Sequence, residues 1–173
     1  MKVFGFSLIE LIIVLSIIGI LSIISMTGFK FFLQNTRSEV LSSQLMRAIH
    51  LARNEAISRH EKIILCGSRD EIICSSEWQM GFIVKTHNKV VYHFQNFLQK
   101  GILHWRSFPM DKQQLEFLVS GYPSFENGSF WFCPPAAVNP DWAIVMNKSG
   151  RTRIAYAEKD GKIRDDKGVA FGC

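Results

Sequence analysis

Most of the first thirty residues are apolar. No charged side chain occurs between Leu11 and Phe29, and Glu10 is the only acid that precedes this stretch. A helix over residues 6–29 would be roughly 36 Å long at about 1.5 Å per residue, which is enough to span a bilayer core. The pattern therefore predicts that 6–29 is a transmembrane segment and the first half of one long helix ending near Arg59.

A different spacing follows Phe29. Apolar residues recur at steps of three and four, and no proline or glycine interrupts residues 30–59, as is typical of an amphipathic helix. We expect residues 30–60 to continue the helix and to lay one apolar stripe on a folded domain. The stripe consists of Leu41, Leu45, Ile49, Ala52 and Ala56.

Residues 61–173 show short β-rich runs divided by turn signals, which predicts one β-rich globular domain. A helix packed on a largely antiparallel β-sheet is an α+β fold. The predicted strands are Lys62–Cys66, Gly81–Lys85, Val90–Phe94, Ile102–Trp105, Leu115–Val119, Ser129–Cys133, Trp142–Asn147 and Arg151–Ala157. The turn signals include His87-Asn88, Asn127-Gly128, Ser149-Gly150 and Asp160-Gly161. The expected core contains Trp78, Phe82, Val84, Phe117, Phe130, Phe132, Trp142 and Ile144.

Composition and charge narrow the class of protein. The 173 residues are 47% hydrophobic and 20% charged, which excludes a disordered chain and suits a single domain. The formal net charge of +5 permits an anionic partner without requiring one. The five histidines are scattered, and no nucleophile, phosphate-loop or dinucleotide motif occurs. We therefore expect no enzyme, no cofactor and no bound metal.

The N-terminus carries a motif directly before the apolar run. Residues Gly5-Phe6-Ser7-Leu8-Ile9-Glu10 resemble the class III signal of type IV pilins and type II secretion pseudopilins. The resemblance implies that a prepilin peptidase removes residues 1–5 by cutting after Gly5, that Phe6 is N-methylated, and that Glu10 acts in filament packing. An acid inside a membrane costs about 2.5–3.5 kcal/mol on insertion scales, so Glu10 needs a partner. The new amine of Phe6 on a neighbouring subunit would supply one.

A second resemblance covers the end of the helix and the first strands. The segment LARNEAISR (51–59) leads to ILCGS (64–68), then to Cys74, then to WQMGFIV (78–84). This order resembles the GspH/FimT group of minor pilins and pseudopilins. The resemblance implies a type IV pilin-like fold and assembly with other pilins or pseudopilins. It also implies a single-pass protein in the bacterial inner membrane, with its C-terminal domain in the periplasm and later in a pilus or pseudopilus.

Export would expose the four cysteines to an oxidising compartment, where three disulfide pairings are possible. The pairing that suits the GspH/FimT group is Cys66–Cys74 with Cys133–Cys173. The second bridge would tie a polar C-terminal tail onto the domain. A zinc site is the rival interpretation, but no Cys-x-x-Cys occurs.

Basic residues concentrate at the C-terminus. Residues 148–173 contain seven basic and four acidic side chains, whereas residues 1–147 contain thirteen and eleven. Arg151 and Arg153 are expected on one face of a strand, because alternate residues point the same way. Two guanidiniums there could grip adjacent phosphates, close to backbone N–H groups of the Ser149-Gly150 turn.

The segment Gly150-Arg151-Thr152-Arg153 resembles the G-R-x-R segment of FimT-type minor pilins that bind DNA. The resemblance assigns DNA contact to Arg151 and Arg153, and Lys148, Lys162 and Arg164 would widen the patch. The predicted function is a minor pilin that binds DNA without sequence preference and aids uptake in natural transformation. The alternative is a purely structural minor pilin or type II secretion pseudopilin. Its arginines would pair with Glu158, Asp160 or a neighbouring subunit. Under either function, we expect the acidic pair Asp165-Asp166, flanked by Arg164 and Lys167, to lie in a solvated loop rather than in a catalytic site.

Overall fold

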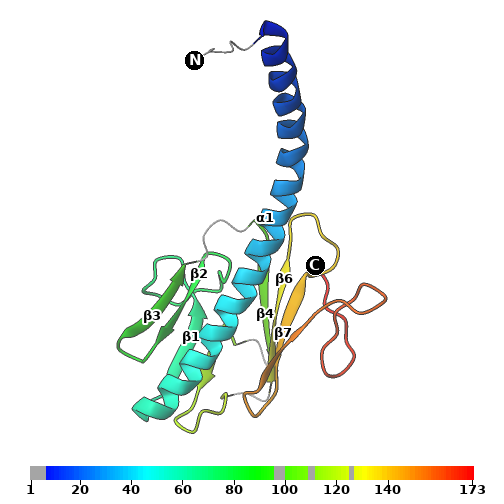
Figure 1. The fold of residues 1–173 in the computed structure, drawn as a ribbon. Coiled ribbons are helices and arrows are strands. Elements are labelled where there is room, and N and C mark those ends of the chain that lie inside the picture. The colour runs from blue at the N-terminus through cyan, green and yellow to red at the C-terminus, as the bar shows by residue number, and fades with distance from the viewer. Residues whose placement is uncertain (1–6, 96–99, 109–111, 125–126) are drawn as a thin grey trace. The chain divides into compact units, whose positions relative to one another are not determined.

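The computed structural model describes residues 7–95, 100–108, 112–124 and 127–173. In these residues one helix, α1 (Leu8–Arg59), precedes a series of strands (Figure 1). The strands are β1 (Ile63–Gly67), β2 (Gly81–Lys85), β3 (Val90–Gln95), β4 (Ile102–Phe108), β5 (Gln114–Phe117), β6 (Asn127–Cys133), β7 (Trp142–Met146) and β8 (Thr152–Ala155).

The chain divides into two compact units, Met1–Arg37 and Ser38–Cys173. In the first unit, every large aliphatic side chain from Leu8 to Leu21 is between 42% and 76% exposed. Over the residues that the structure describes, no helix combines the length and the apolar character needed to cross a membrane. The transmembrane segment 6–29 therefore stays a prediction.

The second unit contains two antiparallel four-stranded sheets, which confirms the predicted largely antiparallel β-sheet domain. Their strand orders are β3-β2-β1-β5 and β4-β6-β7-β8. Each predicted strand is present, with ends displaced by at most three residues. The predicted turn at Asn127-Gly128 is wrong: both residues belong to β6, where Gly128 pairs with Ser107 of β4 and Met146 of β7.

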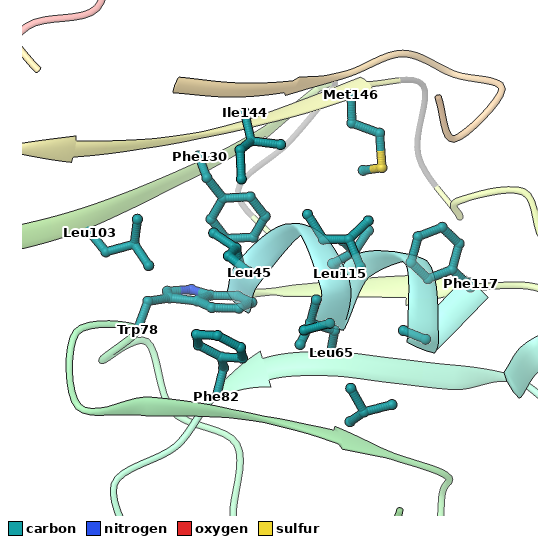
Figure 2. Packing of buried hydrophobic residues seen from close by; sticks show 14 of the residues in the cluster. Leu45, Leu65, Trp78, Phe82, Leu103, Leu115, Phe117, Phe130, Ile144 and Met146 are labelled. Atoms are coloured by element: carbon teal, nitrogen blue, oxygen red, sulfur yellow. The ribbon is translucent and has the colours of Figure 1, made fainter. Parts of the chain in front are cut away.

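One core lies between α1 and the inner faces of both sheets. The predicted stripe of α1 is confirmed, since Leu41, Leu45, Ile49, Ala52 and Ala56 are at most 1% exposed. All eight predicted core residues of the β-rich domain are also buried. Figure 2 shows Leu45 of α1 among side chains from both sheets, with the indole of Trp78 next to Phe82. Two sheets form because a helix with a broad apolar stripe can bury a face of each.

Two local features set the path from the helix into the first sheet. The helix ends at Arg59 because His60 takes a left-handed backbone conformation with φ of 52°, which serves as a C-terminal cap without glycine. At the end of β1, a Cβ on Gly67 would lie 2.9 Å from the backbone nitrogen of Trp78. Glycine at this position therefore lets the Trp78 segment approach the strand closely.

Candidate functional site

The C-terminal tail, residues 156–173, packs on the outer face of the β4-β6-β7-β8 sheet. Ile163 and Phe171 are buried there against Ala143 and Val145 of β7. The indole nitrogen of Trp131 donates a hydrogen bond to the carbonyl oxygen of Gly172 at 3.0 Å. The tail is thus an ordered layer despite its polar composition.

Both disulfides of the pairing implied by the family resemblance form. Cys66 of β1 is bonded to Cys74 in the loop that follows this strand, and Cys133 at the end of β6 is bonded to Cys173. The second bond ties the last residue of the chain to the sheet across 40 positions of sequence. The basic tail is therefore fixed at its end as well as through its two buried side chains.

The turn between β7 and β8 is closed by Asn147. Its side-chain oxygen accepts hydrogen bonds from the backbone nitrogens of Ser149 and Arg151, at 3.1 and 3.0 Å, and its carbonyl oxygen accepts one from Gly150 at 2.9 Å. Gly150 has a φ of 76°, which favours glycine. Asn147 therefore already binds the backbone N–H groups of Ser149, Gly150 and Arg151, which the sequence placed close to the two arginines.

The hairpin rests on the C-terminal part of α1. Arg53 donates to the carbonyl oxygen of Gly150 at 3.3 Å, and the hydroxyl of Thr152 donates to the sulfur of Met46 at 3.0 Å. Thr152 therefore faces the helix. Arg153 lies opposite Val145 on the outer face of the sheet, and Arg151 is exposed one residue before β8 begins.

The predicted basic residues differ in their ion pairing. Arg153 donates to Asp166 at 2.6 Å through Nη2 and at 3.2 Å through Nε. Arg164 pairs with both Glu158 and Asp160. In the part of the chain that the structure describes, Lys148, Arg151 and Lys162 are exposed and form no ion pair.

The acidic pair Asp165-Asp166 is not a merely solvated loop, which corrects the expectation from sequence. Asp165 pairs with Arg106 of β4 at 3.2 Å, and its side chain is only 15% exposed. Sequence reasoning missed Arg106, which lies 59 positions before Asp165 and carries no local motif. Its guanidinium also lies over the rings of Trp131 and Phe171, at 5.7 and 5.5 Å from their centroids.

The electrostatics of the tail follow from these contacts. The hydrogen bond from Arg164 and the backbone N–H of Lys162 lower the pKa of Asp160 to about 2. The same contact with Asp160 raises the pKa of Arg164. The Asp160 carboxylate is therefore ionised at every physiological pH, and it opposes the positive charge of Arg164 beside it.

The N-terminal motif is only partly visible. Gly5 and Phe6 lie outside the described residues. Glu10 lies in the first turn of α1 and is exposed. A carboxylate in this position interacts favourably with the N-terminal end of the helix dipole.

Two family models match the sequence. The model for the type II transport protein GspH covers residues 41–150, which is more than half of the chain. The chain belongs to the GspH family. The prokaryotic N-terminal methylation motif also matches, over residues 1–26. The family relationship predicted from residues 51–84 is thereby confirmed, and it identifies the chain as a minor pilin or pseudopilin. No curated protein matches this sequence.

Solved structures support the same fold. The type IV minor pilin FimU of Pseudomonas aeruginosa, in two crystal forms, is 15% identical and gives TM-scores of 0.53 and 0.51. The match covers 75% of this chain and 95% or 90% of FimU. The minor pseudopilin EpsH of the Vibrio cholerae type II secretion system is 16% identical, covering 72% of this chain and 97% of EpsH, with a TM-score of 0.48. The similarity to FimU therefore shows that this GspH-family chain has a type IV pilin-like α+β fold.

Proposed function

We propose that this chain is a type IV pilus minor pilin, held in the bacterial inner membrane by residues 6–29 until it joins the filament. The observation that carries the proposal is the apolar surface of α1 from Leu8 to Leu21, which is exposed within the stretch, residues 1–26, that matches the methylation motif. A surface of this size requires lipid or neighbouring helices to cover it. Parallel packing against other pilins provides that cover in the filament.

In this proposal the first five residues are a leader. Prepilin peptidase cuts after Gly5, and the exposed amine of Phe6 is N-methylated. Glu10 of an incoming subunit then neutralises the Phe6 amine of its neighbour, which sets the relative height of the two helices. The β-rich domain, 61–173, folds in the periplasm and reaches the cell surface with the pilus.

A Glu10→Gln variant tests the assembly proposal. We expect the variant to reach the membrane with both disulfides formed but to be depleted at least tenfold from sheared pili, measured by immunoblot. Glu39→Gln, at an exposed acid of the same helix, is the matched control and should assemble like the parent. Normal recovery of the Glu10 variant would refute the role of Glu10. Absence of the parent from pili would instead favour a type II secretion pseudopilus.

A second function, sequence-independent DNA binding, is favoured by the basic residues of 148–173. Lys148 lies in the β7–β8 turn and Arg151 directly precedes β8; both are exposed and have no carboxylate partner in the described residues. Lys162 and the two paired arginines, Arg153 and Arg164, extend the positive surface. Such a surface binds phosphates rather than bases, so the affinity should be weak and salt-sensitive. In the cell it would help a retracting pilus to take up DNA in natural transformation.

Fluorescence anisotropy with a labelled random duplex tests this function. The full-length chain in non-ionic detergent is titrated at several salt concentrations beside an Arg151→Gln/Arg153→Gln variant. We expect the variant to lose affinity and to show a salt slope lower by about 0.9 for each phosphate contact removed. The control is Arg59→Gln/Arg69→Gln, which removes two exposed arginines from elsewhere in the domain. Equal binding by all three proteins would refute the assignment to Arg151 and Arg153, and no binding at low salt would leave a structural minor pilin or pseudopilin.

A further inference from the structure

The carboxylate of Asp166, in the tail, accepts hydrogen bonds from the guanidinium of Arg153, which would bind DNA phosphate in the proposed function. Arg153 donates two hydrogen bonds to the same oxygen of Asp166, at 2.6 and 3.2 Å. Both side chains are about half exposed, at 50% for Arg153 and 55% for Asp166. We infer that Asp166 is an affinity-determining residue of the DNA site, because it competes with phosphate for Arg153. This inference rests on the proposed DNA binding.

The position of Asp166 is fixed by its neighbour. Asp165 closes a turn in which its carboxylate accepts hydrogen bonds from the backbone nitrogens of Lys167 and Val169, both at 2.9 Å. The backbone nitrogen of Asp165 donates to Val169, and that of Gly168 donates back to Asp165. The other carboxylate oxygen of Asp165 pairs with Arg106 of β4. The turn therefore cannot easily withdraw Asp166 from β8.

The backbone position of Arg153, the other member of the pair, is fixed as well. Arg153 lies in β8 opposite Val145, and Val145 packs with Ile163 and Phe171 of the tail. The backbone thus keeps Arg153 and Asp166 facing each other, while their half-exposed side chains remain free to exchange partners. A phosphate oxygen accepts hydrogen bonds from the same N–H groups as a carboxylate oxygen. The Arg153 guanidinium can therefore bind either Asp166 or a phosphate, but not both at once.

Because Arg153 can change partner, Asp166 masks it from phosphate only part of the time, which limits the loss of DNA affinity. An exposed arginine–carboxylate pair is only modestly favoured over its separated form, so the fraction of free Arg153 is roughly one half to one sixth. The apparent affinity for DNA is reduced by the same fraction. Arg151 has no such competitor in the described residues, so the two arginines of the G-R-x-R segment are unequal.

A double-mutant cycle tests the inference on the full-length chain in non-ionic detergent, with the same labelled duplex. We expect Asp166→Asn to tighten binding about two- to sixfold and to steepen the salt slope by about 0.9, the value for one added phosphate contact. In an Arg153→Gln background, Asp166→Asn should change the affinity by less than about 1.5-fold, because no masked arginine remains. Circular dichroism and thiol counting confirm that each variant is folded with its disulfides.

The matched control breaks a comparable pair elsewhere. Arg69 and Glu77, between β1 and β2, form an exposed pair at 2.9 Å outside the proposed DNA site. Glu77→Gln therefore removes one negative charge and frees one arginine. Equal tightening by Asp166→Asn with and without Arg153, or equal tightening by Glu77→Gln, would overturn the inference in favour of general charge.

The remaining outcomes separate this inference from the DNA proposal itself. If the parent binds through Arg151 and Arg153 but Asp166→Asn has no effect, DNA binding stands and masking is wrong. If the parent does not bind and Asp166→Asn does, the modest masking inferred here is wrong, because a two- to sixfold effect cannot abolish binding. If neither binds, both fail.

Discussion

Opening the Cys133–Cys173 disulfide should release the tail from an otherwise folded domain. The closed loop spans 40 positions, whereas Cys66–Cys74 spans 8. The chain-entropy relation gives about 4 kcal/mol of stabilisation for the longer loop and about 2.5 kcal/mol for the shorter one. Replacement of Cys133 and Cys173 by serine therefore removes the larger constraint, and removes it from the segment that carries the basic residues.

The noncovalent contacts of the tail are individually modest. Burial of Ile163 and Phe171 contributes about 1.5–3 kcal/mol each, and an exposed pair such as Arg153–Asp166 contributes at most about 1 kcal/mol. The disulfide therefore contributes at least as much as either buried side chain. Without it, we expect residues 156–173 to open far more often, while the core between α1 and the sheets is untouched.

Limited trypsin digestion with mass spectrometry measures the release. Trypsin cleaves after basic residues, and the tail offers Lys159, Lys162, Arg164 and Lys167. We expect cleavage at these positions to be at least tenfold faster in the Cys133→Ser/Cys173→Ser variant than in the parent. In a Cys66→Ser/Cys74→Ser variant the tail should be cleaved at the parental rate. Equal resistance of the tail in all three proteins would show that its noncovalent contacts suffice, contrary to this reasoning.

Two further predictions concern the domain itself. Glu116 is 8% exposed and accepts hydrogen bonds from Lys62 and Gln114, both at 2.6 Å. Burial raises its pKa, but these hydrogen bonds outweigh burial, so the net pKa of Glu116 is lowered. A lowered pKa stabilises the fold above about pH 4.3, the unfolded value, and the gain is lost as pH falls through the folded pKa. Glu116→Gln should therefore cost about 1–3 kcal/mol in urea unfolding at pH 7 and clearly less near pH 3; a pH-independent cost would contradict this. Leu45→Ala, at a position with no exposure, should cost about 2–5 kcal/mol in the same assay, whereas Ile72→Ala, 65% exposed, should cost under about 0.5 kcal/mol.

The features predicted correctly from sequence are those encoded by local periodicity. The stripe from Leu41 to Ala56 follows from three- and four-residue spacing, and the strands follow from short β-rich runs between turns. The partner of each strand is not local. β4 pairs with β6 across residues 102–133 rather than with β3, which precedes it, and this choice creates the second sheet. Asn127-Gly128 has the composition of a turn, but the sheet extends through it.

The ion pairs could not be predicted from the sequence for the same physical reason, since the fold decides which charged side chains meet. A count of charges treats the seven basic residues of 148–173 as equivalent, whereas the fold distributes the four acids unequally among them. Glu158 and Asp160 pair with Arg164, and Asp166 pairs with Arg153. Asp165 pairs with Arg106 of β4, which lies outside the tail. The excess positive charge is therefore concentrated on lysines and on Arg151.

This distribution of ion pairs limits how much of the DNA-binding role implied by the G-R-x-R resemblance can be assigned to this chain from those four residues alone. The four residues Gly150 to Arg153 specify two guanidiniums at the end of a hairpin, and they would do so whatever lay opposite. Whether Arg153 is available depends on Asp166, 13 positions later, and on the turn that Asp165 and Arg106 hold in place. A GspH-family chain with the same tetrapeptide and no acid in this turn should bind DNA more tightly than this one. In the proposed DNA site, the short motif would position the two guanidiniums, and Asp166 facing Arg153 would set how strongly phosphate binds.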